Sequence, residues 1–246
     1  MDKIKKNSFV IGCSGWSYSA WRGVFYPNNV PMRLWFDYYQ QYFKVVEINA
    51  TFYRFFPKQT YLKWYEQAKP GFKYIIKVPR SISHYRRLKH CKRLIKVFCK
   101  SVALLKNKLA LILLQLPPSL SCDVKLLEKA ILAFDDPKKL VVEFRNQTWL
   151  TEETFSLLKK YHCTYCAADS PDMYLKEWIT SKTGYIRLHG RKKWFDYNYS
   201  KTELMAIAKI AKKMRKKGAA KVFILFNNDY YSYAVQNAKT LESLLA

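Results

Sequence analysis

The sequence is poor in acidic residues and histidine, and it lacks the glycine motifs of common nucleotide-binding and hydrolase folds. Its 246 residues hold 18 Asp and Glu against 44 Lys and Arg, and only four histidines. Only His189 stands directly at the end of a predicted strand, so the strand ends offer too few ligands for a multinuclear zinc site. No Gly-x-Gly-x-x-Gly follows a predicted strand and no Gly-x-Ser-x-Gly occurs. Rossmann-type dinucleotide binding and serine hydrolase chemistry therefore both lack support.

Long apolar runs and dense cysteine patterns are missing as well. The most apolar run, residues 109–116, is far shorter than the roughly 20 residues that cross a bilayer. The charged residues 1–6 are followed by no apolar stretch, which argues against a signal peptide. Six scattered cysteines indicate reduced thiols rather than a disulfide framework. We therefore expect a cytoplasmic protein with no membrane association.

The chain does contain enough apolar material for a large core and an unusual excess of positive charge. Half of its residues are hydrophobic and 17% are aromatic, whereas the net charge is +26. Such a charge is typical of proteins that bind nucleic acid or another polyanion, and it also occurs where lysines simply cover solvated helix faces. We expect an anionic ligand, with nucleic acid as the candidate partner. The oligomeric state is not indicated.

Short β-favouring segments alternate along the chain with amphipathic, helix-favouring ones. The expected strands are residues 9–14, 45–49, 73–78, 109–116, 140–144, 163–167, 185–188 and 222–226. The expected helices are residues 32–42, 58–67, one ending near 107, 121 or 122 to 134, one capped by Thr151, 201–217 and 234–245. This alternation indicates right-handed βαβ units and a parallel sheet. Eight units in this length predict an α/β fold, a TIM-like (β/α)₈ barrel, as a single domain over residues 1–246.

Polar side chains stand at the end of every predicted strand, which is where such barrels place their chemistry. Our candidate catalytic residues are Glu47, Glu143, His189 and Asp169. The candidate ligand-binding residues are Ser14, Trp16, Asn49, Tyr53, Lys77, Gln115, Arg145, Trp149, Arg187 and Asn227. Charged residues also stabilise the layers of barrels, so any one of them can be structural instead.

The charges at the strand ends balance, and buried ions must be paired and hydrogen-bonded. We therefore expect an interlocked network of three carboxylates and three cations: Glu47, Glu143, Asp169, Lys77, Arg145 and Arg187. Loop arginines Arg54, Arg80 and Arg191 add positive charge, which suits a phosphate ester or a carboxylate. No cofactor is expected, although the carboxylates are compatible with a single Mg²⁺.

Several motifs occur in one order along nearly the whole chain. They are residues 11–18 (IGCSGWSY), 46–53 (VEINATFY), Lys77 with Ser83-His84, 115–118 (QLPP), 143–145 (EFR) with Trp149, 187–190 (RLHG) and 226–229 (FNND). In these motifs the chain resembles the YecE-like family, known as domain of unknown function number 72. The resemblance implies a TIM-like barrel and no established reaction. Ser83 stands where Thr is common, and Asn146 where His is common, so a histidine role at residue 146 is not expected.

Three functions fit these residues. The first is an enzyme acting on a phosphate-bearing substrate, nucleic acid or nucleotide, with Glu47 or Glu143 as base and His189 as acid or ligand. Its anion clamp would consist of Lys77, Arg145 and Arg187. The second is a non-catalytic barrel that binds nucleic acid through basic and aromatic side chains. The third is a metal-independent sugar isomerase or glycosidase, for which paired carboxylates are typical.

Overall fold

The computed structural model describes residues 8–246, and the charged segment 1–6, on which the expectation of no signal peptide rests, lies outside the described residues. Among the described residues, eight parallel strands form a closed barrel in chain order, which confirms the predicted (β/α)₈ fold. The strands are β1 (Phe9–Cys13), β2 (Val45–Ile48), β3 (Lys73–Lys77), β4 (Leu109–Gln115), β5 (Leu140–Glu143), β6 (Thr164–Asp169), β7 (Thr183–Leu188) and β8 (Lys221–Phe226).

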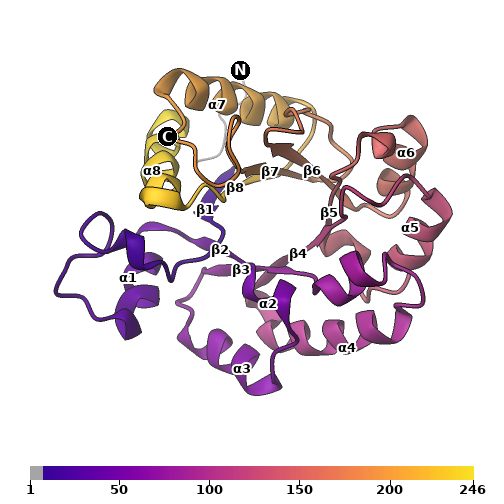
Figure 1. Ribbon diagram of the computed structural model, residues 1–246, viewed down its shortest axis with the longest axis horizontal. Coiled ribbons are helices and arrows are strands. Elements are labelled where there is room, and N and C mark those ends of the chain that lie inside the picture. The colour runs from indigo at the N-terminus through magenta and orange to yellow at the C-terminus, as the bar shows by residue number, and fades with distance from the viewer. Residues whose placement is uncertain (1–7) are drawn as a thin grey trace. The chain divides into compact units, whose positions relative to one another are not determined.

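Helices connect the strands, as Figure 1 shows. They are α1 (Trp35–Tyr42), α2 (Ala50–Tyr53), α3 (Lys58–Gln67), α4 (Lys92–Val102), α5 (Val124–Ile131), α6 (Glu152–Lys160), α7 (Lys201–Lys216) and α8 (Tyr233–Leu245). Short helical turns occur in several loops, including a π-helical turn at Ser81–Tyr85 after β3. Throughout the described part of the chain, every helix is too short or too polar to cross a bilayer.

Most predicted boundaries differ from the observed ones by a few residues, and two of these differences have a clear physical reason. Helix α5 begins at Val124 rather than at residue 121 or 122, because the Asp123 carboxylate caps it by accepting a hydrogen bond of 2.9 Å from the Leu126 amide. Strand β6 extends to Asp169 rather than ending at residue 167. The Asp169 carbonyl accepts a hydrogen bond of 2.8 Å from the His189 amide, so Asp169 belongs to the sheet and not to the following loop.

The contacts divide the described residues into two compact units, which we treat separately. Unit 1 consists of residues 8–47 and 167–246. Strand β8 pairs in it with β1 and with β7, in registers that end at Cys13↔Phe226 and Leu188↔Phe226. Helix α8 packs on β1, and α7 packs on β7 and β8 (Figure 1). Helix α7 begins with a capping box in which Ser200 and Glu203 satisfy each other's backbone amides.

Unit 2 consists of residues 48–166. Strand β4 pairs in it with β3 and with β5, and the second register ends at Gln115↔Glu143. Helix α4 buries Ile95, Phe98 and Val102 at helical spacing and leaves its lysines in solvent. Strands and helices of this unit thus enclose an apolar core, while the ends of the strands carry the polar groups.

Backbone hydrogen bonds continue past the strand ends of unit 1 and align the residues that follow. The Ser14 amide donates to the Phe226 carbonyl, and the Asn227 amide donates to the Leu188 carbonyl, both at 2.8 Å. Backbone hydrogen bonds alone therefore hold residues that lie far apart in the sequence side by side at the carboxyl edge of these strands.

Glycine at position 12 of β1 allows the close approach of β1 to β2, which carries Glu47. A Cβ at Gly12 would lie 2.3 Å from the Val45 carbonyl oxygen, whereas a Cβ at Gly71, whose φ is +82°, would contact nothing within 4 Å. Gly12→Ala should lower the free energy of unfolding by about 3 kcal/mol or more, because backbone must move. Gly71→Ala should cost only about 1–2 kcal/mol of backbone strain. Urea denaturation measures both, and a smaller loss for Gly12→Ala than for Gly71→Ala would contradict this packing.

Candidate active site

Glu47 is fully buried in unit 1, and three donors surround its carboxylate. Oε1 accepts hydrogen bonds from Ser14 Oγ at 2.8 Å and from Arg187 Nη2 at 2.5 Å, and Oε2 accepts one from Tyr185 OH at 2.7 Å. The predicted residues Ser14, Glu47 and Arg187 are thus brought together, whereas Tyr185 was not predicted. These three hydrogen bonds satisfy both oxygens of the buried carboxylate.

His189 and Asn227 form a second contact in unit 1. Nδ1 of His189 lies 3.0 Å from the Asn227 amide nitrogen, so Nδ1 accepts and the neutral ring carries its proton on Nε2. The ring packs against Trp194, with centroids 5.3 Å apart, and His189 is only 1% exposed. Its neighbours fix the orientation of the imidazole and leave it little access to solvent.

Asp169 pairs with a loop arginine rather than with a cation at a strand end. Arg191 Nε lies 2.9 Å from Asp169 Oδ2, and its Nη1 lies 3.1 Å from Glu203 Oε1. Burial raises the pKa of Asp169, and the Arg191 guanidinium opposes that shift. Arg191 was expected, with Arg54 and Arg80, to add positive charge to the loops. Its charge is instead offset by two carboxylates, which it bridges.

Glu143 and Arg145 form a buried ion pair in unit 2, with Arg145 Nε 2.5 Å from Glu143 Oε1. Gln115 lies beside Glu143 in the register of β4 and β5. Trp149 is fully buried, donates a hydrogen bond of 2.7 Å from Nε1 to the Leu120 carbonyl and stacks on Phe144. Trp149, predicted to bind ligand, therefore packs the loop after β5 and presents no exposed face.

Lys77, at the end of β3, lies against the aromatic residues of the neighbouring helix α2. Its Nζ is 4.2 Å from the centroid of the Phe52 ring, and that ring meets the His84 imidazole edge-on at 4.8 Å. Helix α2 is fixed in place because Thr51 Oγ1 donates to the Lys77 carbonyl at 2.7 Å. This arrangement brings Lys77 close to a histidine that the sequence did not place in the site.

His84 is the half-buried centre of a group that we call the His84 cluster. Its members are Phe52, Lys77, Arg80, His84, Glu143 and Arg145. Partial burial, and then the positive charges of Lys77, Arg145 and Arg80, lower the pKa of His84 to about 4, while Glu143 opposes the shift. The imidazole is therefore neutral at physiological pH. A neutral, partly exposed histidine among cations can receive a proton once an anion arrives.

Ser83 controls which nitrogen of His84 is available. Its Oγ lies 2.8 Å from His84 Nδ1 and 3.5 Å from the Pro79 carbonyl oxygen. When the hydroxyl donates to the Pro79 carbonyl, Oγ accepts a hydrogen bond from Nδ1–H, and Nε2 carries the lone pair of the neutral ring. The sequence signal for His84 was the Ser83-His84 motif in the loop after the third strand.

The other predicted residues lie at the edges of these groups. Trp16 is half-buried in unit 1 against Phe36, with ring centroids 4.8 Å apart. Asn49 stands at the start of α2 in unit 2, and its buried Oδ1 has no hydrogen-bond partner among the described residues. Tyr53 is 65% exposed at the other end of the same helix. Seven of the predicted residues thus belong to each unit: Ser14, Trp16, Glu47, Asp169, Arg187, His189 and Asn227 to unit 1, and Asn49, Tyr53, Lys77, Gln115, Glu143, Arg145 and Trp149 to unit 2.

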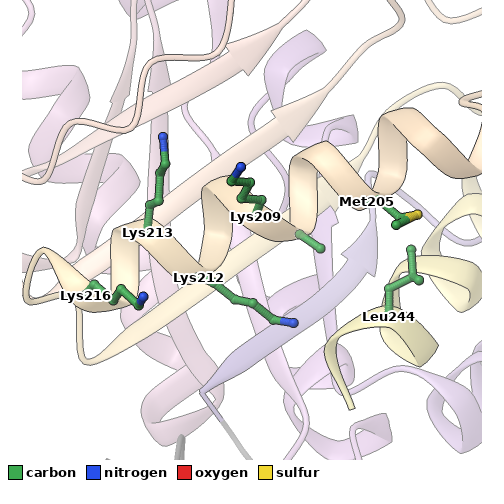
Figure 2. Close-up of a pocket in the computed structure, with 7 residues that line it drawn as sticks. Met205, Lys209, Lys212, Lys213, Lys216 and Leu244 are labelled. Atoms are coloured by element: carbon green, nitrogen blue, oxygen red, sulfur yellow. The ribbon is translucent and has the colours of Figure 1, made fainter. Parts of the chain in front are cut away.

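A surface groove of about 520 Å³ lies elsewhere, on α7 and α8 of unit 1 (Figure 2). Figure 2 shows four lysines of α7 beside it and Met205 facing Leu244 at one end. The lysines recur at helical spacing, at residues 209, 212, 213 and 216, so their apolar stems form the walls. The lining contains no histidine, cysteine or carboxylate, so this groove is not our candidate active site. No group of three or more potential metal ligands occurs in residues 8–246.

Comparison with known proteins agrees with the motifs and the fold. Residues 10–246 match the model of a family described as "Protein of unknown function DUF72". The chain belongs to the DUF72 family. It is 27% identical over 276 residues to UPF0759 protein YunF of Bacillus subtilis, covering 96% of this chain and 94% of YunF. It is also 30% identical to UPF0759 protein YecE of Escherichia coli K12 over 107 residues, which are 44% of this chain and 37% of YecE.

Two crystal structures of DUF72 proteins share the fold. One, from Thermotoga maritima, has a TM-score of 0.88 at 27% identity and covers 96% of this chain and 98% of that chain. Another, from Enterococcus faecalis, has a TM-score of 0.83 at 21% identity, with coverages of 96% and 95%. The DUF72 family has no assigned reaction, so the chemistry must be argued from the side chains.

The ion pair of Glu47 and Arg187 gives a first prediction for the site. Glu47→Gln keeps the shape of the side chain but leaves the Arg187 charge buried opposite a neutral amide. It should lower the free energy of unfolding by about 3–5 kcal/mol. Glu153→Gln on the exposed face of α6 is the matched control and should change it by less than about 0.5 kcal/mol. Urea denaturation measures both, and equal stabilities would show that the pair is dispensable.

The lowered pKa of His84 gives a second prediction. Its pKa is about 4 in the folded protein against an ordinary 6.5, so the unfolded chain binds the extra proton between those pH values. The His84 contribution therefore weakens the folded state as pH falls from 6.5 to about 4. His84→Asn should flatten the pH dependence of the urea midpoint, whereas His162→Asn, at an exposed turn, should not. Identical pH profiles for both variants would refute the lowered pKa.

Proposed function

We propose that this DUF72 protein is an enzyme that acts on a phosphate-bearing substrate bound at the His84 cluster of unit 2. The observation that carries the proposal is a neutral, half-buried His84 within the electric field of Lys77, Arg80 and Arg145. Such an excess of positive charge around a titratable group is costly unless it serves an anion. A phosphate ester supplies the charge that this cluster complements.

Arg80 is the most accessible cation of the cluster. Among the described residues its guanidinium contacts two tyrosine rings and no carboxylate. Its planar set of N–H donors matches two phosphate oxygens at once. Lys77 and Arg145 lie deeper, where their charges act on a bound anion in a medium that screens them less than water does.

Binding of the substrate itself would activate His84. The negative charge of a phosphate offsets the fields of Lys77, Arg80 and Arg145, so it raises the pKa of His84 from about 4 toward neutrality. A general base or acid is most effective when its pKa lies near the working pH. The imidazole thus gains its proton affinity at the moment when the substrate is in place.

A hydrolytic step follows from this geometry. Nε2 of His84 accepts a proton from a water molecule while the water oxygen forms a bond to phosphorus. The bond from phosphorus to the leaving oxygen breaks on the opposite side of phosphorus, that oxygen leaves as an anion or takes a proton from solvent, and the imidazolium returns its proton to solvent. Arg145, oriented by Glu143, stabilises the charge on the phosphoryl oxygens during the transfer, whereas Arg80 holds the phosphate equally before and during the step.

The carboxylates fit other roles less well. Glu47 is fully buried, and both of its oxygens already accept hydrogen bonds within the protein. Glu143 lies against Arg145, which favours its charged form and opposes the general-acid role that a glycosidase needs. A barrel that binds nucleic acid without turnover would use the same cations, and only a kinetic measurement separates it from an enzyme.

Hydrolysis of bis(p-nitrophenyl) phosphate and p-nitrophenyl phosphate tests the proposal. We expect slow release of p-nitrophenolate, with inorganic phosphate as a competitive inhibitor. His84→Asn should lower kcat about 100- to 10,000-fold, as loss of a general base does. Arg80→Gln should instead act mainly on KM, because it removes an interaction that is made before the transition state.

Two controls make this test decisive. His162→Asn replaces an exposed histidine outside the cluster and should keep full activity. Inhibition by phosphate should weaken in Arg80→Gln and persist in His84→Asn. Phosphate binding without hydrolysis by the native protein would favour the non-catalytic alternative, and activity that survives His84→Asn would refute the role of His84.

A further inference from the structure

Two exposed tyrosines flank Arg80 at the surface of unit 2. Tyr53 is 65% exposed and Tyr85 is 68% exposed, although aromatic rings of this size are usually buried for the most part. The Arg80 guanidinium carbon lies 5.4 Å from the centroid of the Tyr53 ring and 5.2 Å from that of Tyr85. One cation therefore contacts two solvent-facing rings. We call these three residues the Tyr–Arg platform.

The rings are presented by anchored elements. Tyr53 ends α2, which is held by hydrogen bonds from Thr51 Oγ1 to the Ile48 and Lys77 carbonyls at 3.1 and 2.7 Å. Tyr85 ends the π-helical turn, in which the Arg86 amide donates to the Ser81 carbonyl at 3.3 Å. Because the backbone is fixed on both sides, a ligand that stacks on these rings orders few additional groups.

Positive charge continues from the platform along the loop that follows it. Leu88 is 4% exposed, and its amide donates to the Ile82 carbonyl at 3.0 Å, which pins the loop to the protein. Arg86, Arg87 and Lys89 around it are exposed. Residues 67–122 contain no Asp or Glu, so no neighbour in this part of the sequence neutralises them. The surface next to the two rings is therefore basic.

We infer that the Tyr–Arg platform binds an unpaired nucleotide of single-stranded nucleic acid, with a base stacked on Tyr53 or Tyr85 and phosphates on Arg80 and the loop arginines. This inference rests on the proposed function and names its substrate class. Aromatic faces accept any base, whereas arginines follow the phosphates of the backbone. A duplex keeps its bases stacked inside and offers this platform only phosphates. DNA and RNA share the chemistry, and both are included in the test.

Binding of fluorescein-labelled oligothymidylate and oligouridylate, followed by fluorescence anisotropy at low salt, tests the inference. Tyr53→Ala or Tyr85→Ala, whichever removes the ring under the base, should raise Kd about 5- to 150-fold, the range typical for loss of one stacked base. Tyr53→Phe and Tyr85→Phe keep the ring and should bind as the native protein does. Tyr174→Ala, which removes an 80% exposed tyrosine of unit 1, is the control and should leave Kd unchanged. Arg80→Gln removes one phosphate contact and should therefore reduce the slope of log Kd against log salt concentration by about one.

The outcomes separate this inference from the proposed function. Binding of either oligonucleotide that is lost in the alanine variants supports the platform. Equal binding by the native and alanine variants, or tighter binding of duplex than of single strands, would overturn it. Hydrolysis of bis(p-nitrophenyl) phosphate and its inhibition by phosphate do not require stacking. If the native protein hydrolyses bis(p-nitrophenyl) phosphate and is inhibited by phosphate but binds no oligonucleotide, the platform is refuted and the phosphate site is retained.

Discussion

The placement of charge in the interior of this barrel depends first on the ion pair between Glu47 and Arg187. Both side chains are fully buried, and each would carry a large desolvation cost alone. Their partners come from three strands, because Ser14 follows β1, Glu47 lies in β2, and Tyr185 and Arg187 lie in β7. Tyr185 and Arg187 are two residues apart, so they project from the same face of their strand. One carboxylate thereby ties together segments that are more than a hundred residues apart in the chain.

The His84 cluster of unit 2 follows the opposite principle. Glu47 is surrounded by donors that stabilise its charge, whereas His84 lies among cations that oppose its protonation. The first arrangement pairs its charges within the protein itself, and we propose that the second takes up an anion. This contrast is why we place the chemistry at His84 and a supporting role at Glu47, although both residues stand near strand ends.

The sequence was sufficient for the fold, because eight apolar strands alternate with amphipathic helices along nearly the whole chain, and among the described residues only the segment between the sixth and seventh strands lacks one. A carboxylate amid Val45, Val46 and Ile48 also indicated that Glu47 needs a buried cation, and Arg187 at the end of another strand was a reasonable partner. Tyr185 was not predictable, since in sequence it resembles an ordinary core aromatic. The partner of Asp169 was missed because Arg191 lies in a loop, whose path no periodicity specifies.

His84 shows most clearly where sequence reasoning reaches its limit. It lies seven residues beyond β3, and its position depends on a π-helical turn that has no sequence signature comparable to an α-helix. Its neighbours Phe52 and Arg145 come from two other parts of the chain. The pKa of the ring depends on all of them together, so the Ser83-His84 motif could mark the residue without giving its chemistry.

An NMR titration of the His84 imidazole, with and without inorganic phosphate, tests the central claim most directly, and His84→Asn assigns the signal. We predict a pKa of about 4 without phosphate and a marked rise when phosphate saturates the site. A His84 that titrates near its ordinary value of 6.5 without phosphate, or whose pKa does not change when phosphate is added, would contradict the account.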